Sequence, residues 1–356
     1  MFYDRKKTRV IKIGAVPIGA GNPVAVQSMT NTATSDVRAT VNQIKKLEQA
    51  GCEIIRVAVP DVASTKALKK IGRAIKIPLV ADIHFDYKLA IESINNGADK
   101  IRINPGNIGS NDKTKQVIQA AKKAGIPVRI GINSGSIKRK SQILSRDMVS
   151  TALDYIRMFE DWDFHKIVVS LKTSDVKSTI DSYMALAKKT NYPLHLGLTE
   201  SGPPGSGTIK SALGIGILLF NGIGDTIRVS LTGNPVEEVS AGYRILQALT
   251  LRSYGIDLIS CPTCARCSVG LAEIMKKFEN DISGYSSELM KRFPEKPLKV
   301  AVMGCEVNGP GEARHADIGI AGGKHTGLLF KKGKPVRKVP PGEWVRALIS
   351  EIRRYR

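Results

Sequence analysis

The chain has 356 residues, of which 42% are hydrophobic, and a formal net charge of +22. This length allows one large domain with a smaller one, and the composition is that of a protein with a full hydrophobic core. No apolar run is long enough to cross a bilayer, and the first residues lead into no signal-peptide core. We therefore expect a cytoplasmic protein that does not associate with membranes.

The excess of basic residues, 54 Lys and Arg against 32 Asp and Glu, has two interpretations. Basic residues can neutralise the phosphates of a nucleic acid, or they can attract a small anionic substrate into a cleft. Here they are spread along the whole chain without a nucleic-acid-binding motif, and aromatic residues, which stack on bases, make up only 5%. We expect a small anionic substrate and no nucleic acid.

Short β-branched runs alternate with helical segments through the first two thirds of the chain. The segments Val37–Ala50 and Lys113–Ala124 have helical periodicity, and Gly51, Gly97 and Gly125 stand where helix C-caps are expected. Eight strand–helix units in about 230 residues match a (β/α)8 TIM-type barrel. An open doubly wound sheet is the alternative, but no G-x-G-x-x-G follows the first strand. The predicted strands are Val24–Met29, Glu53–Val59, Leu79–His84, Lys100–Asn104, Val128–Asn133, Lys166–Leu171, Leu194–Thr199 and Thr226–Leu231.

Polar residues recur near the predicted carboxyl ends of these strands. In a barrel these ends converge on one face, where active sites of this fold are built. Any one of the residues could be an ordinary salt-bridged side chain, but four arginines and a lysine on one face suit a strongly anionic ligand such as a phosphate. The glycine-rich turns 104–109 and 133–136 could add backbone N–H groups. The polar residues are Arg56, Asp82, His84, Arg102, Asn104, Arg129, Asn133, Ser170, Lys172, His195, Thr199, Glu200, Asp225, Arg228 and Ser230.

A second, smaller α/β unit is predicted after the barrel. The segment Val236–Leu251 is expected to be a helix that leads out of the barrel. We therefore expect two domains, residues 1–250 and 251–356. The predicted elements of the second are a helix near Val269–Phe278, strands Leu298–Met303 and Asp317–Ala321, a surface hairpin in Lys324–Lys338 and a closing helix Pro341–Arg353.

Four of the five cysteines lie in this second unit. Cys261, Cys264 and Cys267 have C-x-x-C-x-x-C spacing, and Cys305 follows a predicted strand. In a reducing compartment, clustered cysteines indicate a metal site or catalysis rather than disulfides. Soft thiolates select zinc, copper(I) or iron–sulfur clusters. The spacing leaves structural zinc, an all-cysteine cluster and a mixed-ligand cluster open, whereas the isolated Cys52 is expected to be a buried apolar residue.

Several strings of residues are specific when they are taken together. They resemble the 4-hydroxy-3-methylbut-2-enyl diphosphate synthase family of the methylerythritol phosphate route to isoprenoids, and the resemblance covers nearly the whole chain. The strings are VQSMTNT (26–32), RVAVP (56–60), DIHF (82–85), IRINPGNIG (101–109), RIGINSGS (129–136), HLGLTE (195–200), GDTIRVSL (224–231), CPTC (261–264) and NGPGE (308–312).

The resemblance implies a [4Fe–4S] cluster bound by Cys261, Cys264, Cys305 and the carboxylate of Glu312, with no ligand role for Cys267. A carboxylate is a more labile ligand than a thiolate, so one iron could accept a substrate oxygen and Glu312 would also act in catalysis. The implied reaction opens the ring of 2-C-methyl-D-erythritol 2,4-cyclodiphosphate and removes a hydroxyl as water. Its product is (E)-4-hydroxy-3-methylbut-2-enyl diphosphate, formed with two electrons from ferredoxin or flavodoxin.

The same resemblance assigns roles to the barrel residues. Glu200 is the candidate proton donor to the departing hydroxyl, and its alternative role is a salt bridge to the arginines. The family also implies a homodimer with a composite active site, in which the cluster domain of one subunit caps the barrel of the other. The predicted substrate-binding residues are Arg56, Arg102, Asn104, Arg129, Asn133, Lys172, Thr199, Arg228 and Ser230.

Two other classes of protein would use some of the same features. A zinc-stabilised nucleic-acid-binding protein would use the cysteines and the positive charge, but it leaves the arginines of the barrel mouth unexplained. A pterin- or phosphate-handling transferase would keep the barrel and give the cysteine domain a structural role. Iron content and a requirement for a reductant distinguish both classes from the reductive enzyme.

Overall fold

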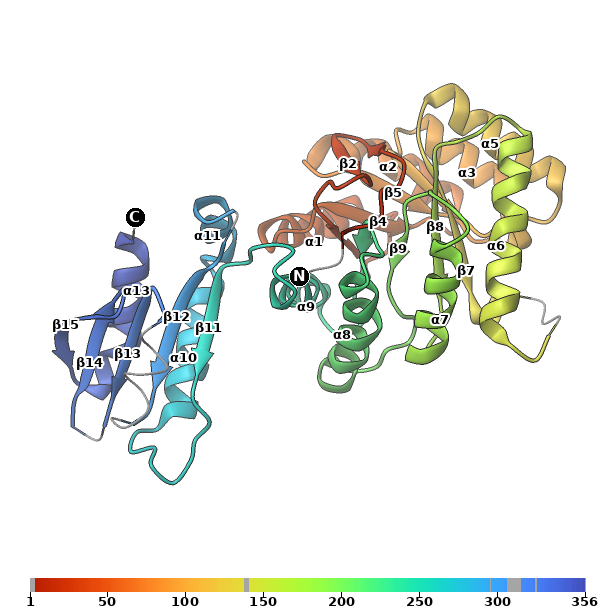
Figure 1. The fold of residues 1–356 in the computed structure, drawn as a ribbon. Coiled ribbons are helices and arrows are strands. Elements are labelled where there is room, and N and C mark those ends of the chain that lie inside the picture. Colours follow the sequence, from red (N-terminus) through yellow and green to blue (C-terminus); the bar gives the residue numbers. More distant parts are fainter. Residues whose placement is uncertain (1–3, 138–140, 295, 306–314, 324, 356) are drawn as a thin grey trace. The chain divides into compact units, whose positions relative to one another are not determined.

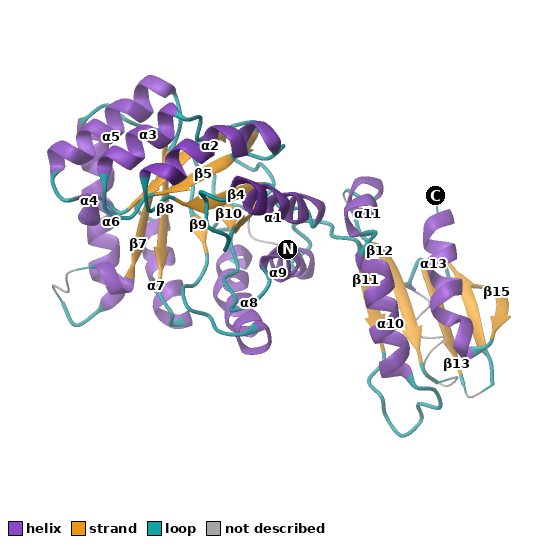
Figure 2. Ribbon diagram, turned by 180° about the vertical axis from the view of Figure 1, so that it is seen from behind, coloured by secondary structure: helices purple, strands orange, loops and turns teal. Residues whose placement is uncertain are grey.

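The computed structural model describes residues 4–137, 141–294, 296–305, 315–323 and 325–355. The chain divides into two compact units, Met1–Leu251 and Arg252–Arg356. Both units combine helices with a sheet (Figures 1 and 2). Among the described residues, no helix is both long and apolar enough to span a membrane.

The first unit is a barrel of eight parallel strands. Its hydrogen-bonded order is β8-β7-β6-β5-β4-β3-β10-β9, and a parallel bridge between Val169 of β8 and Leu194, just before β9, closes the ring. The predicted (β/α)8 fold is therefore confirmed. The strands are β3 (Ala25–Met29), β4 (Ile54–Ala58), β5 (Leu79–Asp82), β6 (Lys100–Ile103), β7 (Val128–Asn133), β8 (Ile167–Lys172), β9 (His195–Leu196) and β10 (Thr226–Ile227).

The last two strands are much shorter than the sequence predicted, with two residues each. Beyond them the chain keeps single hydrogen bonds in place of a regular ladder. The Arg228 N–H donates to the Leu196 carbonyl at 3.0 Å, and the Thr199 N–H donates to the Thr173 carbonyl at 3.1 Å. The residues after β9 and β10 therefore stay at the carboxyl end of the barrel although they are not strand residues.

Helices surround the barrel, and their ends follow local capping chemistry. Asp36, Asp61, Asp86 and Asp175 each accept a hydrogen bond from a backbone N–H in the first turn of the following helix. The predicted glycine stops are confirmed, since Gly51, Gly97 and Gly125 have φ values of 96°, 88° and 73°. The helices are α1 (Val37–Gln49), α2 (Val62–Ala74), α3 (Tyr87–Asn95), α4 (Pro105–Ile108), α5 (Asn111–Ala124), α6 (Leu144–Asp161), α7 (Val176–Ala187), α8 (Pro204–Phe220) and α9 (Pro235–Ala248).

Helix α9 corrects one sequence prediction. It was expected to lead out of the barrel, but it packs against β3 and lies between α8 and α1. It is therefore the eighth helix of the barrel. The hydrophobic periodicity of this segment predicts a helix and cannot reveal which strand the helix covers.

An N-terminal hairpin that the sequence analysis did not predict closes one end of the barrel. Its strands are β1 (Ile11–Ile13) and β2 (Val16–Ile18). Their isoleucines pack against Ala25, Ile54 and Val80, which lie in the first halves of their barrel strands. Strands of three residues are too short to show an alternating pattern. The hairpin covers the amino-terminal end, so the carboxyl end is left for a ligand.

The second unit contains a five-stranded sheet with the order β11-β12-β13-β14-β15. The strands β11 to β13 are parallel, and β14 and β15 form the predicted antiparallel hairpin. Helices α10 and α13 cover one face (Figure 2), and their core includes Phe278 and Trp344. Strand β11 and helix α11 were not predicted. The elements are β11 (Ile256–Ser260), α10 (Leu271–Ser283), α11 (Ser286–Arg292), β12 (Leu298–Met303), β13 (Ile318–Gly322), β14 (Gly327–Lys331), β15 (Lys334–Val339) and α13 (Trp344–Arg354).

Two glycines of the barrel allow a matched test of backbone conformation. Gly125 is the left-handed C-cap of α5, with φ of 73°. A Gly125→Ala substitution should destabilise the protein by about 1 kcal/mol, because alanine is strained in this conformation. Gly72 lies inside α2 with open space around it, so Gly72→Ala should stabilise by up to about 1 kcal/mol. Urea unfolding of the two variants and the wild type measures the change in the free energy of unfolding for each substitution. Changes of the same sign would contradict the assigned conformations.

Candidate functional site

A cavity of about 210 Å³ lies at the carboxyl end of the barrel. All of the predicted substrate-binding residues line it except Asn104. Three polar residues that the sequence placed at strand ends, Asp82, His84 and Ser170, line it as well. The complete lining is Met29, Arg56, Asp82, His84, Arg102, Arg129, Asn133, Ser170, Lys172, Leu198, Thr199, Arg228 and Ser230.

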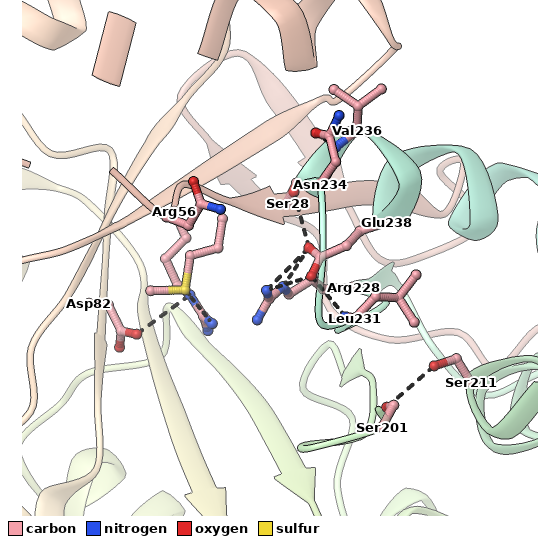
Figure 3. A network of polar contacts seen from close by, with 12 residues as sticks. Ser28, Arg56, Asp82, Ser201, Ser211, Arg228, Leu231, Asn234, Val236 and Glu238 are labelled. Atoms are coloured by element: carbon pink, nitrogen blue, oxygen red, sulfur yellow. Dashed lines mark hydrogen bonds and ion pairs between the residues drawn. The ribbon is translucent and has the colours of Figure 1, made fainter. Parts of the chain in front are cut away.

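Asp82 fixes two of the arginines. Its two carboxylate oxygens lie 3.5 Å from Arg56 Nε and 3.1 Å from Arg102 Nη1, and Figure 3 shows Arg56 directed at Asp82. Burial alone would raise the pKa of Asp82, but the positive charges of Arg56 and Arg102 outweigh it and hold this pKa below its usual value. The carboxylate is therefore ionised and orients both guanidinium groups. Burial lowers the pKa of Arg56 to about 10, which leaves it protonated at neutral pH.

Glu238 fixes a third arginine from outside the ring of strands. It lies on α9, and its oxygens accept hydrogen bonds from Arg228 Nη2 at 3.0 and 3.1 Å. The same carboxylate accepts from the Leu231 N–H at 3.0 Å and from Ser28 Oγ at 3.3 Å (Figure 3). Glu238 was not predicted as a site residue, because it lies on a helix and not at the end of a strand. An acidic partner for Arg228 could have been expected from the sequence, because a buried arginine needs one.

Two further cations have no carboxylate partner among the described residues. Arg129 is 1% exposed, and its Nε and Nη1 atoms form no hydrogen bond there. Lys172 is 7% exposed, and burial together with Arg56 and Arg129 lowers its pKa well below the usual value. The cavity thus brings together four arginines and Lys172, against two carboxylates, Asp82 and Glu238. This excess of positive charge favours a ligand with several negative charges.

Two glycines, Gly131 in β7 and Gly197 just after β9, leave room for these basic side chains. A Cβ atom on Gly131 would overlap the Arg102 guanidinium, and one on Gly197 would press on Lys172 Nζ. Arg102 also donates from Nη2 to the Gly131 carbonyl at 3.2 Å. The glycines in the strings RIGIN and HLGLTE therefore allow long cationic side chains to lie flat across neighbouring strands.

Asn104 has a supporting position outside the cavity lining. Its Oδ1 accepts from the Gly106 N–H at 3.2 Å, and its Nδ2 donates to Ser136 Oγ at 2.9 Å. It therefore joins the two glycine-rich turns that follow β6 and β7. These hydrogen bonds fix the turns, and they occupy both polar atoms of the Asn104 side chain with partners in the protein.

Two of the polar residues that the sequence placed at carboxyl ends lie at amino ends instead. Asp225 precedes β10, accepts from the Leu194 N–H at 2.8 Å and pairs with Arg5 at 3.4 Å. His195 is the first residue of β9 and is fully buried. Their sequence positions already indicate this, since His195 is the second residue of the predicted strand Leu194–Thr199 and Asp225 precedes the predicted strand Thr226–Leu231.

Glu200 follows Thr199 just beyond β9 and is exposed. It does not line the cavity, and among the described residues it forms no ion pair with the arginines. Its backbone has φ of 54°, a conformation that is strained for a residue other than glycine and is common at functional sites.

The cysteines of the second unit lie at the ends of paired strands. Cys261 directly follows β11, and Cys305 follows β12 after one glycine. Because Ser260 pairs with Val302 in parallel register, both cysteines lie at the same edge of the sheet. The Gly304 N–H donates to Cys261 Sγ at 3.3 Å, and a backbone hydrogen bond at Arg266 lowers the pKa of the exposed Cys264.

This donor set fits a centre with soft ligands, since thiolates and N–H···S hydrogen bonds are typical of iron–sulfur sites. Within the described ranges, no group of three His, Cys, Asp or Glu side chains is gathered closely enough to hold a metal ion. Glu312, the predicted fourth ligand, lies outside the described residues. Cys267 packs against the hydrophobic core, with Sγ 3.4 Å from the Val269 carbonyl oxygen.

Solved structures with a similar fold are dihydropteroate synthases. The enzyme from Stenotrophomonas maltophilia aligns with a TM-score of 0.52 at 14% identity, over 68% of this chain and 98% of that one. The enzyme from Yersinia pestis aligns with a TM-score of 0.51 at 15% identity, over the same shares. At this identity the likeness concerns the barrel fold alone.

Sequence relatives are much closer. A Clostridium tetani protein named 4-hydroxy-3-methylbut-2-en-1-yl diphosphate synthase (flavodoxin) is 54% identical over 98% of this chain and 99% of its own length. A protein of the same name from Caldanaerobacter subterraneus subsp. tengcongensis is 54% identical over 99% and 98%. Residues 8–243 match the model of the GcpE TIM-barrel domain, and residues 257–354 match that of the GcpE protein C-terminal domain. With both of its units matched in this way, the chain belongs to the GcpE family.

Proposed function

We propose that this chain catalyses the reductive ring opening and dehydration of 2-C-methyl-D-erythritol 2,4-cyclodiphosphate to (E)-4-hydroxy-3-methylbut-2-enyl diphosphate. The observation that carries the proposal is the excess of positive charge in the barrel mouth. A cyclic diphosphate is small and densely anionic, so it matches both the volume and the charge of the cavity. The names of the relatives from Clostridium tetani and Caldanaerobacter subterraneus support the same assignment.

Within the barrel, the substrate diphosphate would lie against the cations of the cavity. Arg129 and Lys172 have donors to offer because no described carboxylate engages them. Arg56, Arg102 and Arg228 are held in place by Asp82 and Glu238 and present their remaining N–H groups. Asn133, Thr199 and Ser230 complete the polar lining, while Asn104 would act indirectly through the two glycine-rich turns.

In the second unit, Cys261, Cys264 and Cys305 would bind a [4Fe–4S] cluster, with Glu312 as the fourth ligand. When bound, the cluster supplies two electrons, one at a time, to break the C–O bond to phosphate. The sheet edge fixes the backbone of Cys261 and Cys305, and the Gly304 N–H stabilises the thiolate of Cys261. The names of the relatives include the word flavodoxin, which suggests a flavodoxin as electron donor. The net charge of +22 would favour binding of an acidic donor protein.

Glu200 is proposed to give a proton to the departing hydroxyl, which leaves as water. Its position just beyond the cavity residue Thr199 and its strained backbone support this role. A carboxyl group at this position must reach the substrate after the diphosphate is bound. In this proposal the basic residues of the cavity bind the substrate, and the role of Glu200 is limited to proton transfer.

We also propose that the barrel of one chain works with the cluster unit of a second copy. Helix α8 supports a dimer, because Ile209, Leu213 and Ile217 recur every four residues on its surface and are 64%, 50% and 39% exposed. Apolar stripes of this kind are usually buried between subunits. Two chains related by a twofold axis would contain two composite sites.

The proposed reaction is tested with a matched pair of cysteine variants. After anaerobic reconstitution, the wild type should hold about four iron and four sulfide per chain and convert the cyclodiphosphate when a reductant is added. Cys305→Ser should lose both properties, because it removes a ligand. Cys267→Ser should keep both, since the proposed ligand set does not include Cys267, whose Sγ lies 3.4 Å from the Val269 carbonyl oxygen. A zinc-containing wild type without sulfide would refute the function, and cluster loss in Cys267→Ser would refute the ligand set.

The anion site is tested by Arg129→Met, which keeps the volume and removes the charge. We expect the Kd for inorganic pyrophosphate to rise about 10- to 100-fold, as for the loss of a charge-assisted hydrogen bond. Arg157→Met is the control, because the Arg157 side chain is 69% exposed on α6 and outside this cavity. Calorimetric titration measures both variants, and equal affinities would remove Arg129 from the site.

The composite site is tested by mixing two inactive variants. Glu200→Gln should lower kcat about 100-fold or more with little change in KM, because it removes a proton donor. Cys305→Ser should lack the cluster. If barrel and cluster come from different chains, random mixing of the two should restore about a quarter of the wild-type activity, since one site in each mixed dimer carries neither defect. If each chain forms its own site, mixing restores nothing.

A further inference from the structure

The barrel interior holds a second layer of polar side chains that the site described above does not use. Lys100, the first residue of β6, is fully buried, and its Nζ forms no hydrogen bond to any described residue. His195 on β9 is also fully buried, with Nδ1 2.8 Å from Thr226 Oγ1, and its Nε2 has no partner among the described residues. Gln27 on β3 is 1% exposed, and neither of its amide atoms has a partner in the described part of the chain.

These side chains face into the barrel, beside the cations of the mouth. On β3 the next residue, Ser28, bonds outward to Glu238 of α9, so Gln27 points inward. Lys100 lies within electrostatic reach of Arg129 and Arg56, and His195 within reach of Arg129, Lys172 and Lys100. Buried polar atoms without protein partners are commonly satisfied by ordered water, which also gives protons a route to the interior.

The balance of charge around Lys100 is unfavourable while the cavity is without an anion. The other charged or titratable groups of the interior are almost all cationic or basic, and Asp82 already serves two arginines. Burial, then Arg129 and Arg56, lower the pKa of Lys100 well below its usual value. The surrounding groups are Arg56 on β4, Asp82 on β5, Arg102 on β6, Arg129 on β7, Lys172 on β8, His195 on β9 and Arg228 close to β10.

We propose that Lys100 is a proton acceptor that couples binding of an anion in the cavity to uptake of a proton from solvent. The inference rests on the proposed diphosphate site and assigns to it a residue that does not touch the substrate. A polyanion bound against Arg56 and Arg129 cancels the positive charge that, in addition to burial, disfavours the ammonium form of Lys100. The amine then takes a proton through the interior water, and the ammonium adds to the field that positions the diphosphate.

The sign of the pH dependence follows from linkage. Anion binding raises the pKa of Lys100, so the bound state holds more protons than the free state. Affinity should therefore increase as the pH falls through the interval between the pKa of the free protein and that of the complex. Lys172 lines the cavity and titrates in the same direction, so only a comparison of variants isolates Lys100.

The test is calorimetric titration of the anaerobically prepared holoprotein with inorganic pyrophosphate, in two buffers that differ in ionisation enthalpy. Lys100→Met should take up fewer protons than the wild type, by close to one. The Kd of Lys100→Met should also depend less steeply on pH than that of the wild type. The difference between the two slopes should be up to about a tenfold change in Kd per pH unit. Protonation changes of pyrophosphate and of Lys172 are common to both proteins and cancel. Lys100→Gln serves as a second variant of similar length.

The outcomes separate this inference from the proposed function. Equal proton uptake in the wild type and both variants, with pyrophosphate bound, would overturn the role of Lys100 and leave the anion site intact. Failure of the wild type to bind pyrophosphate would overturn the site and the inference with it. Thermal unfolding is the independent readout: Lys100→Met should be more stable than the wild type, increasingly so as the pH falls below about 10. A less stable variant would mean that Lys100 is charged and paired in the free protein.

Discussion

The charge balance of the barrel mouth is the constraint on which the rest of the site depends. Charged groups are stable away from water only when they are paired, hydrogen-bonded or neutralised. Here Asp82 holds Arg56 and Arg102, and Glu238 holds Arg228. Arg129 and Lys172 are left without acidic partners in the described part of the chain. The fold therefore holds an excess of positive charge that an anionic ligand would relieve, and this excess is the basis of the proposed diphosphate site.

The same geometric rule positions the functional groups of both units. In a parallel sheet every strand ends at the same edge, so residues far apart in sequence meet where the strands stop. In the barrel this rule gathers cations from β4, β6, β7 and β8. In the second unit it places Cys261 and Cys305 at one edge, because β11 and β12 run in parallel register. The proposed cluster site and the proposed substrate site thus arise from the same kind of backbone arrangement.

The sequence predicted the carboxyl ends of β3 to β8 to within two residues but made β9 and β10 too long, and it was weakest where position depends on tertiary pairing. The arginines were found because long cationic side chains are rare in apolar strands, and Cys52 was correctly expected to be buried, with 3% exposure. Glu238 was missed because it reaches Arg228 from a helix. Asp225 and His195 lie at amino ends because they stand at the start of their strands in the sequence. The hairpin β1–β2 is too short to show a pattern, although it closes the opposite end of the barrel.

The likeness to dihydropteroate synthases shows how little of this chemistry the fold itself determines. A TM-score of 0.52 at 14% identity means that the backbone of the barrel is shared while most side chains differ. In this chain the cavity depends on particular residues in and just after the strands: glycines at 131 and 197, close to Arg102 and Lys172, and a buried lysine at 100. Each of these residues matters because it controls positive charge. A barrel with the same strands but without this excess of basic side chains would lack the attraction for a diphosphate on which the proposed function depends.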